Sequence, residues 1–157
     1  MDVLSLEVVH DLPARAFDAN EILIEEGGNP AELFFLKTGA VEILKGETSV
    51  AKEYTPGAVF GEMSVLLGGE ATATVRTIAP SVFLVAENGV EFLKAHPELS
   101  LSIAMLLAMR LEAVTRYLAD VKGQYHTAEG HLGMIDSLLE TLMARHPRKV
   151  ERGDRGH

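Results

Sequence analysis

Glycine spacing is the feature that most limits what this chain can fold into. Eight of the 14 glycines lie between Gly27 and Gly69, and they separate short apolar runs such as EILI, ELFFL and AVEIL. Regularly spaced turns between short strands are typical of a closed roll or barrel, which hides most of its strand edges. Residues 20–87 are therefore predicted to form a β-roll.

The pattern changes after Gly89, where helical spacing replaces turns. Residues 90–95 predict a short helix, and Pro97 is expected to begin a long helix that ends at Gly123. Apolar residues at alternating spacings of four and three form the seam of a two-stranded coiled coil: Leu107, Leu111, Val114, Leu118 and Val121. We expect this seam to form a homodimer. The alternative is that it packs against the roll of its own chain.

One more amphipathic helix is predicted over residues 129–145, and Pro147 ends it. Its inward-facing residues are expected to be Leu132, Ile135, Leu138, Leu139 and Leu142. The expected organisation has three parts. Residues 1–122 form the β-roll with the long dimerisation helix, residues 123–147 hold the C-terminal amphipathic helix, and residues 148–157 are a flexible, charged tail.

Composition excludes several classes of function. Of the 157 residues, 47% are hydrophobic, which is enough for a core, and the formal net charge is −9. That charge argues against direct binding to nucleic acid, which needs a basic face. We expect no membrane association, because no apolar run approaches the roughly 18 residues that cross a bilayer. We also expect no signal peptide, because the N-terminal residues MDVLSLEVVHDLP lack a basic start followed by a long apolar stretch. The absence of cysteine excludes disulfides and thiolate metal sites, and it fits a bacterial, cytoplasmic protein.

The segment FGEMSVLLGGEATATV, residues 60–75, combines two glycine turns with a short apolar run. Gly61 allows the backbone to approach a ligand and to adopt a turn that other residues resist. Residues 62–67 predict a short helix whose free N–H groups favour an anion, and Ser64 adds a hydroxyl to its first turn. Taken alone, Glu62 is explained as an acidic residue that stabilises a helix N-terminus.

This segment resembles the phosphate-binding cassette of the cyclic-nucleotide-binding domain family, which includes the catabolite activator protein and the regulatory subunits of protein kinase A. The family pattern is Phe-Gly-Glu, two small or apolar residues, a short helix, then Arg, a small residue, Ala, Thr and Val. Its spacing is matched without insertion. The similarity runs from Phe17 to Val121 and includes FDANEILIEEGGNPAELFFLKTGAVEIL, with Gly28 and Gly39.

The resemblance implies an α+β fold. It consists of an eight-stranded, jelly-roll-like β-roll with short N-terminal and cassette helices, a long C-terminal helix and one further helix. It also implies a cyclic nucleotide as ligand, with Glu62 accepting hydrogen bonds from a sugar hydroxyl. The implied ligand-binding residues are Gly61, Glu62, Met63, Ser64, Ala71, Thr72 and Thr74.

The sequence departs from the family at Ala71, where the pattern has its phosphate-binding arginine. Loss of one partner of a buried charge pair costs about 3–5 kcal/mol, so affinity should fall by about two to three and a half orders of magnitude. Arg76 is five positions away, on the opposite face of a strand and about 17 Å along it. Lys37, Lys45 and Lys52 lie in neighbouring strands or turns, and one of them could approach from across the roll. The sequence does not show which of the three does so.

We therefore expect a non-enzymatic, ligand-sensing regulatory module whose binding of cyclic AMP or cyclic GMP is weak or altered, without a further cofactor or a metal. The alternative is a degenerate, ligand-free scaffold for dimerisation or protein interaction. A helix-turn-helix transcription factor is disfavoured, because one helix and a tail follow Gly123. A metal-dependent roll enzyme is disfavoured, because none of the six histidines lies in the predicted strands.

Overall fold

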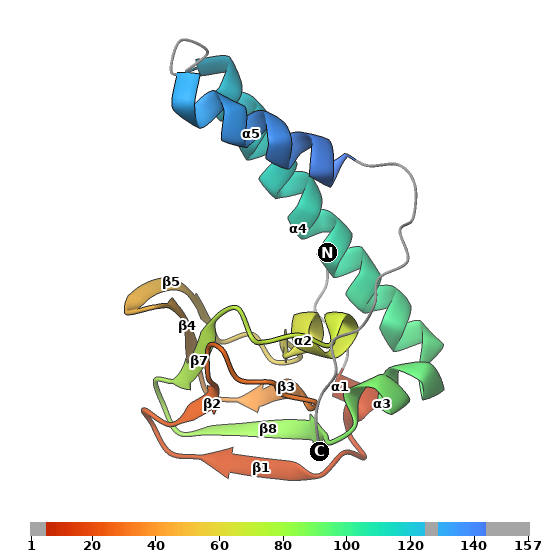
Figure 1. Ribbon diagram of the computed structural model, residues 1–157. Helices are drawn as coiled ribbons and strands as arrows, with labels where there is room; N and C mark the ends of the chain where they lie inside the picture. Colours follow the sequence, from red (N-terminus) through yellow and green to blue (C-terminus); the bar gives the residue numbers. More distant parts are fainter. Residues whose placement is uncertain (1–5, 125–128, 144–157) are drawn as a thin grey trace. The chain divides into compact units, whose positions relative to one another are not determined.

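The computed structural model describes residues 6–124 and 129–143. Within them, eight strands form two four-stranded antiparallel sheets. Figure 1 shows how most of these strands are arranged. The strands are β1 (Ala14–Phe17), β2 (Ile22–Ile24), β3 (Leu33–Thr38), β4 (Val41–Lys45), β5 (Thr48–Glu53), β6 (Val59–Phe60), β7 (Thr74–Thr77) and β8 (Ser81–Ala86). The predicted eight-stranded roll is confirmed.

The two sheets have interleaved strand orders, β1-β8-β3-β6 in one and β2-β7-β4-β5 in the other. Consecutive strands therefore often lie in different sheets, and the connecting turns carry the chain between them. Several glycines that the sequence marks as turns have positive φ, among them Gly39 at +105° and Gly57 at +93°. L-residues rarely adopt this backbone conformation, which explains why glycine stands there.

The core between the sheets is aromatic and aliphatic. Phe83 on β8 is fully buried, and its ring lies 5.6 Å from that of Phe17, 6.3 Å from that of Phe34 and 6.1 Å from that of Phe60, each edge-on. Edge-to-face packing is favoured for aromatic rings at these distances. Because Phe60 directly precedes the segment with the candidate site, this core fixes where that segment begins.

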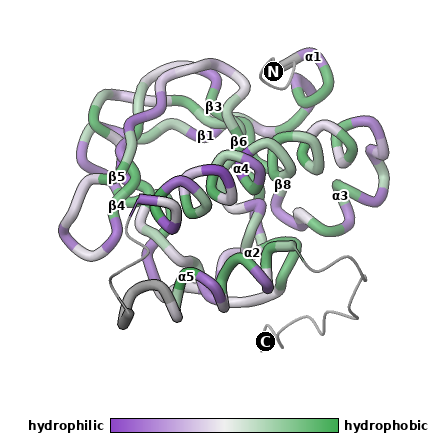
Figure 2. The backbone as a smooth tube through the Cα atoms, turned by 90° about the horizontal axis from the view of Figure 1, so that it is seen from above, coloured by the Kyte–Doolittle hydropathy of each residue, from purple (hydrophilic) through white to green (hydrophobic). Residues whose placement is uncertain are grey.

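Three short helices accompany the roll: α1 (Leu6–Val9), α2 (Glu62–Leu67) and α3 (Gly89–Ala95). The observed bounds of α2 are those predicted from the sequence. Its chain is drawn mostly in hydrophobic colours in Figure 2, although Met63, Leu66 and Leu67 are 42–47% exposed. Gly89 lies against Val65 of α2, since a Cβ at Gly89 would be 2.8 Å from a Val65 methyl carbon. This close contact joins α2 to α3.

The chain divides into two compact units between Leu101 and Ser102, within the long helix α4 (Pro97–Gln124). In the second unit, α5 (Glu129–Leu142) follows α4, and Lys122 of α4 forms an ion pair with Asp136 of α5.

Two expectations for these helices need correction. Gly123 does not end α4, which continues to Gln124, because a glycine costs a helix only about 1 kcal/mol. Leu138 is 45% exposed rather than inward-facing. The side chain of Leu132 and the expected tail, residues 148–157, lie outside the described residues.

Candidate ligand-binding site

The candidate site begins at Gly61, which precedes the first residue of α2. Gly61 has a φ of +92°, and a Cβ there would lie 2.7 Å from the carbonyl oxygen of Glu32. Its own carbonyl accepts a hydrogen bond from the Val65 amide at 3.0 Å, which closes the first turn of the helix. Only glycine satisfies both the backbone angle and the close approach to Glu32.

The first turn of α2 buries its two polar residues together with Val65, and it exposes Met63. Glu62 and Ser64 are each only 6% exposed, whereas Met63 is 45% exposed. Buried carboxylates are uncommon unless they have polar partners. The helix ends at Gly68, whose amide donates to the Ser64 carbonyl at 2.7 Å. The sequence-predicted residues of this turn therefore form one compact, polar segment.

The backbone of Ala71 is hydrogen-bonded to the turn after β2. Its amide donates to the Gly28 carbonyl at 2.7 Å, and its carbonyl accepts from the Gly27 amide at 2.8 Å. The Ala71 side chain is 7% exposed and belongs to the core cluster that includes Ile24 and Phe60. Residue 71 is thus held by backbone hydrogen bonds and surrounded on its inner side by apolar groups.

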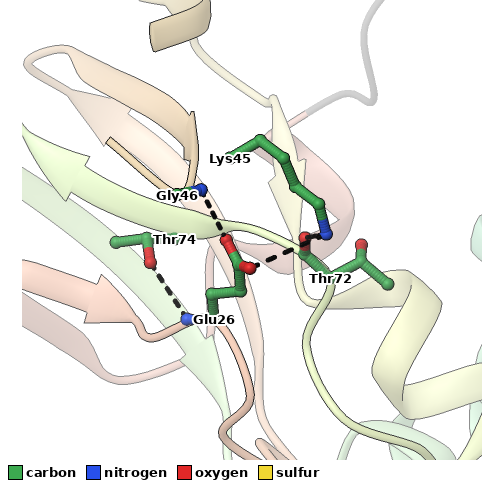
Figure 3. A network of polar contacts seen from close by, with 5 residues as sticks. All are labelled: Glu26, Lys45, Gly46, Thr72 and Thr74. Atoms are coloured by element: carbon green, nitrogen blue, oxygen red, sulfur yellow. Dashed lines mark hydrogen bonds and ion pairs between the residues drawn. The ribbon is translucent and has the colours of Figure 1, made fainter. Parts of the chain in front are cut away.

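Thr72 and Thr74 contact an ion pair between Lys45 and Glu26, as Figure 3 shows. Lys45 Nζ donates to the Thr72 carbonyl at 2.6 Å and lies 3.7 Å from Glu26 Oε2. Glu26 Oε1 accepts from the Gly46 amide at 2.9 Å, and the Glu26 amide donates to Thr74 Oγ1 at 3.0 Å. Thr72 is exposed and Thr74 is partly buried. These contacts bring Lys45, at the end of β4, to the cassette.

The other basic residues considered from the sequence have different surroundings. Arg76 Nη2 donates to Glu42 Oε1 on the neighbouring strand β4 at 2.6 Å, so its guanidinium is engaged away from Ala71. Lys52 lies opposite Glu42 on β5, and Lys37 is exposed near the end of β3. Lys45 is the lysine of the three whose ammonium contacts residues 71–74 in the described structure.

Glu26 was missed by the reasoning from sequence. It stands in the run EEGG, which indicates a turn, and its partners Gly46 and Thr74 are 20 and 48 positions away. No local pattern marks such contacts. Among the described residues, no group of three or more His, Cys, Asp or Glu is arranged to hold a metal. Over the same residues, no helix is long and apolar enough to cross a membrane.

The fold and the site define a β-roll domain with a short helix between β6 and β7 as its candidate ligand-binding segment. Residues 14–92 match the sequence model described as the cyclic nucleotide-binding domain. The chain belongs to this family, as the resemblance from sequence indicated.

Individual relatives show similarity over parts of their length. A cyclic nucleotide-gated potassium channel of Mesorhizobium japonicum is 32% identical over 87 residues, which are 55% of this chain and 23% of the channel. The catabolite activator protein of Thermus thermophilus has a similar structure, with a TM-score of 0.64 and 23% identity over 74% of this chain and 57% of that chain. A cyclic-nucleotide-binding domain of a protein kinase A regulatory subunit, solved with the ligand Sp-2Cl-cAMPS, has a TM-score of 0.56 and 23% identity over 73% of this chain and 75% of that chain. The chain thus spans less than a quarter of the channel and little more than half of the activator.

Proposed function

We propose that this chain is a non-enzymatic ligand-sensing module that binds cyclic AMP or cyclic GMP weakly, or binds a related ligand of lower charge. The observation that carries this proposal is Ala71, a buried methyl group where the family pattern has an arginine. An arginine binds a phosphate through two parallel hydrogen bonds, and an alanine offers none.

The remaining geometry supports a ligand site with altered chemistry rather than a lost one. Gly61 keeps its positive φ, and Glu62 and Ser64 stay buried at the start of α2. In our proposal, Glu62 accepts hydrogen bonds from ligand hydroxyl groups, and Ser64 lies in the same turn. The ligand then gains most of its affinity from its sugar-like and apolar parts, and less from its anionic part.

The output of the module is proposed to pass through α4, as a homodimer. Leu111 and Val114 of the expected seam are 43% and 49% exposed, and Leu107, Leu118 and Val121 are partly buried. Apolar residues at seam spacing that stay accessible in one chain are suited to a second copy of the same helix. We place this assembly in the cytoplasm, without a role in direct nucleic acid binding.

Calorimetric titration with cyclic AMP and cyclic GMP tests the ligand proposal, with the native chain and an Ala71→Arg variant measured side by side. We expect millimolar or weaker binding by the native chain and a gain of about two to three and a half orders of magnitude in the variant. Micromolar binding by the native chain would contradict the claim that Ala71 weakens the site.

The second candidate is a ligand-free scaffold, favoured by the exposed apolar residues of α4, which include Leu101, Met105 and Met109. This candidate predicts that neither the native chain nor the Ala71→Arg variant binds a cyclic nucleotide. It also predicts an association of α4 that does not respond to added nucleotide. The same titration, with sedimentation run at each ligand concentration, separates the two candidates.

A further inference from the structure

Among the described residues, Lys45 is the lysine whose ammonium contacts residues 71–74, and it ends β4. Val41 belongs to the core cluster, and Ile43 packs against it. Because side chains alternate along a strand, Lys45 lies on the same face of β4 as these two residues. The ladder pairs Leu44 with Thr74, so Lys45 lies beside the stretch that leads from Ala71 into β7. Lys45 itself is exposed, so its polar contacts decide where its ammonium lies.

Two contacts show where the ammonium of Lys45 lies. Its ammonium donates to the Thr72 carbonyl at 2.6 Å, one residue after Ala71, and lies near Glu26 at 3.7 Å. The side chain is still 60% exposed, and that of Glu26 is 36% exposed. An ammonium has three N–H donors. The ammonium of Lys45 therefore contacts Thr72 and Glu26 on a side chain that is still largely open to solvent.

We propose that Lys45 supplies the positive charge of the ligand site, in place of the missing arginine, and that Glu26 competes with the ligand for it. This inference rests on the proposed function, because it assumes that a small molecule binds between α2 and residues 71–74. The ligand class it specifies is a small molecule with hydroxyl groups and one negative charge, such as a cyclic phosphodiester.

The chemistry of lysine sets the properties of such a site. An ammonium makes single hydrogen bonds to an anion, whereas a guanidinium makes two in parallel, so orientation of the phosphate is less strict. Because the Lys45 side chain is largely exposed, the attraction of its charge for an anion is screened by salt over about 10 Å at 0.1 M. Affinity for an anionic ligand should therefore fall as ionic strength rises, and affinity for a neutral analogue should not.

The test is an NMR titration of the ¹⁵N-labelled full chain at low ionic strength, which measures dissociation constants in the millimolar range. The ligands are cyclic AMP and adenosine, which has the base and sugar without the phosphate. Lys45→Met keeps the length of the side chain and removes the charge. Lys52→Met is the matched control, an exposed lysine on the adjacent strand β5. Glu26→Gln removes the competing charge and retains an acceptor for the Gly46 amide.

We expect Lys45→Met to weaken cyclic AMP binding about tenfold and to leave adenosine binding unchanged. Glu26→Gln should strengthen cyclic AMP binding by about two- to fivefold, since a half-exposed ion pair contributes little. Lys52→Met should match the native chain. In the native chain, the Gly46 amide donates a hydrogen bond to Glu26. If cyclic AMP displaces the Glu26 carboxylate from Lys45, this hydrogen bond changes and the amide resonance of Gly46 should shift.

Failure of this inference differs from failure of the proposed function. Equal cyclic AMP affinities for the native chain and Lys45→Met would overturn the role of Lys45 while the ligand site stands. A native chain that binds neither ligand, beside an Ala71→Arg variant that binds cyclic AMP, would also overturn it, because the pocket would be competent and Lys45 insufficient. If no chain bound either ligand, the Ala71→Arg variant included, the proposed function itself would be overturned.

Discussion

Replacing Ala71 by arginine should make the ligand-free domain less stable, and a cyclic nucleotide should reverse much of that loss. Ala71 is 7% exposed and packs in a cluster with Ile24, Phe34 and Phe60. A cation placed there without a partner loses hydration that no protein group replaces. We expect the charge to cost about 3 kcal/mol, the low end for an uncompensated buried charge, because a long side chain relieves part of it.

The assay is thermal unfolding of native, Ala71→Arg and Ala71→Met chains. Methionine adds a long neutral side chain, so the difference between the two variants isolates the charge from the added volume. A loss of about 3 kcal/mol corresponds to roughly 12–24 °C in melting temperature for a domain near 100 residues. Cyclic AMP at 100 times its dissociation constant should return about 2.7 kcal/mol to the arginine variant. Equal melting of the two variants without ligand would refute the apolar surroundings assigned to residue 71.

Three further outcomes follow from the structure. Gly61→Ala should lower the free energy of unfolding in urea by about 2 kcal/mol or more, because the added Cβ would meet a backbone oxygen. Gly46 also has a positive φ but has open space around it, so Gly46→Ala should lower the free energy of unfolding by only about 1 kcal/mol. Phe83→Ala should lose about 3–5 kcal/mol in the same measurement, and a loss near 1 kcal/mol would contradict the aromatic core. Leu111→Glu should convert a dimeric chain to monomers in sedimentation equilibrium, and a native chain that is already monomeric would remove the proposed dimer.

The fold could be predicted well because its signals are local. Turn glycines such as Gly39 and Gly57 require positive φ and mark where strands end. The short helix of residues 62–67 begins after one glycine and ends at another, so both its bounds were visible in the sequence. Local turn and cap signals therefore predicted these elements correctly, although the local signal of Gly123 did not mark the end of α4.

The charged part of the site could not be predicted because its contacts are distant in sequence. Three lysines stood in suitable strands or turns, and choosing Lys45 requires the register of β4 against both neighbours. That register includes an irregularity between Ile43 and Leu44 in the pairing with β5. Glu26 joins the hairpin of Gly46 to the strand of Thr74, and neither partner is implied by its position. The prediction for Arg76 assumed a continuous strand from residue 71, whereas β7 begins at Thr74, so alternation does not relate the two positions. What engages Arg76 is its hydrogen bond to Glu42 on β4.

The two hydrogen bonds that hold Ala71 have an evolutionary consequence. Both use main-chain atoms alone, from Gly27, Gly28 and Ala71 itself. Every residue except proline retains the amide that they need, so position 71 can mutate while the loop keeps its course. Among such domains, residue 71 can therefore vary in charge on one unchanged backbone. The limit on that variation is set by its apolar neighbours, which make an arginine cost about 3 kcal/mol.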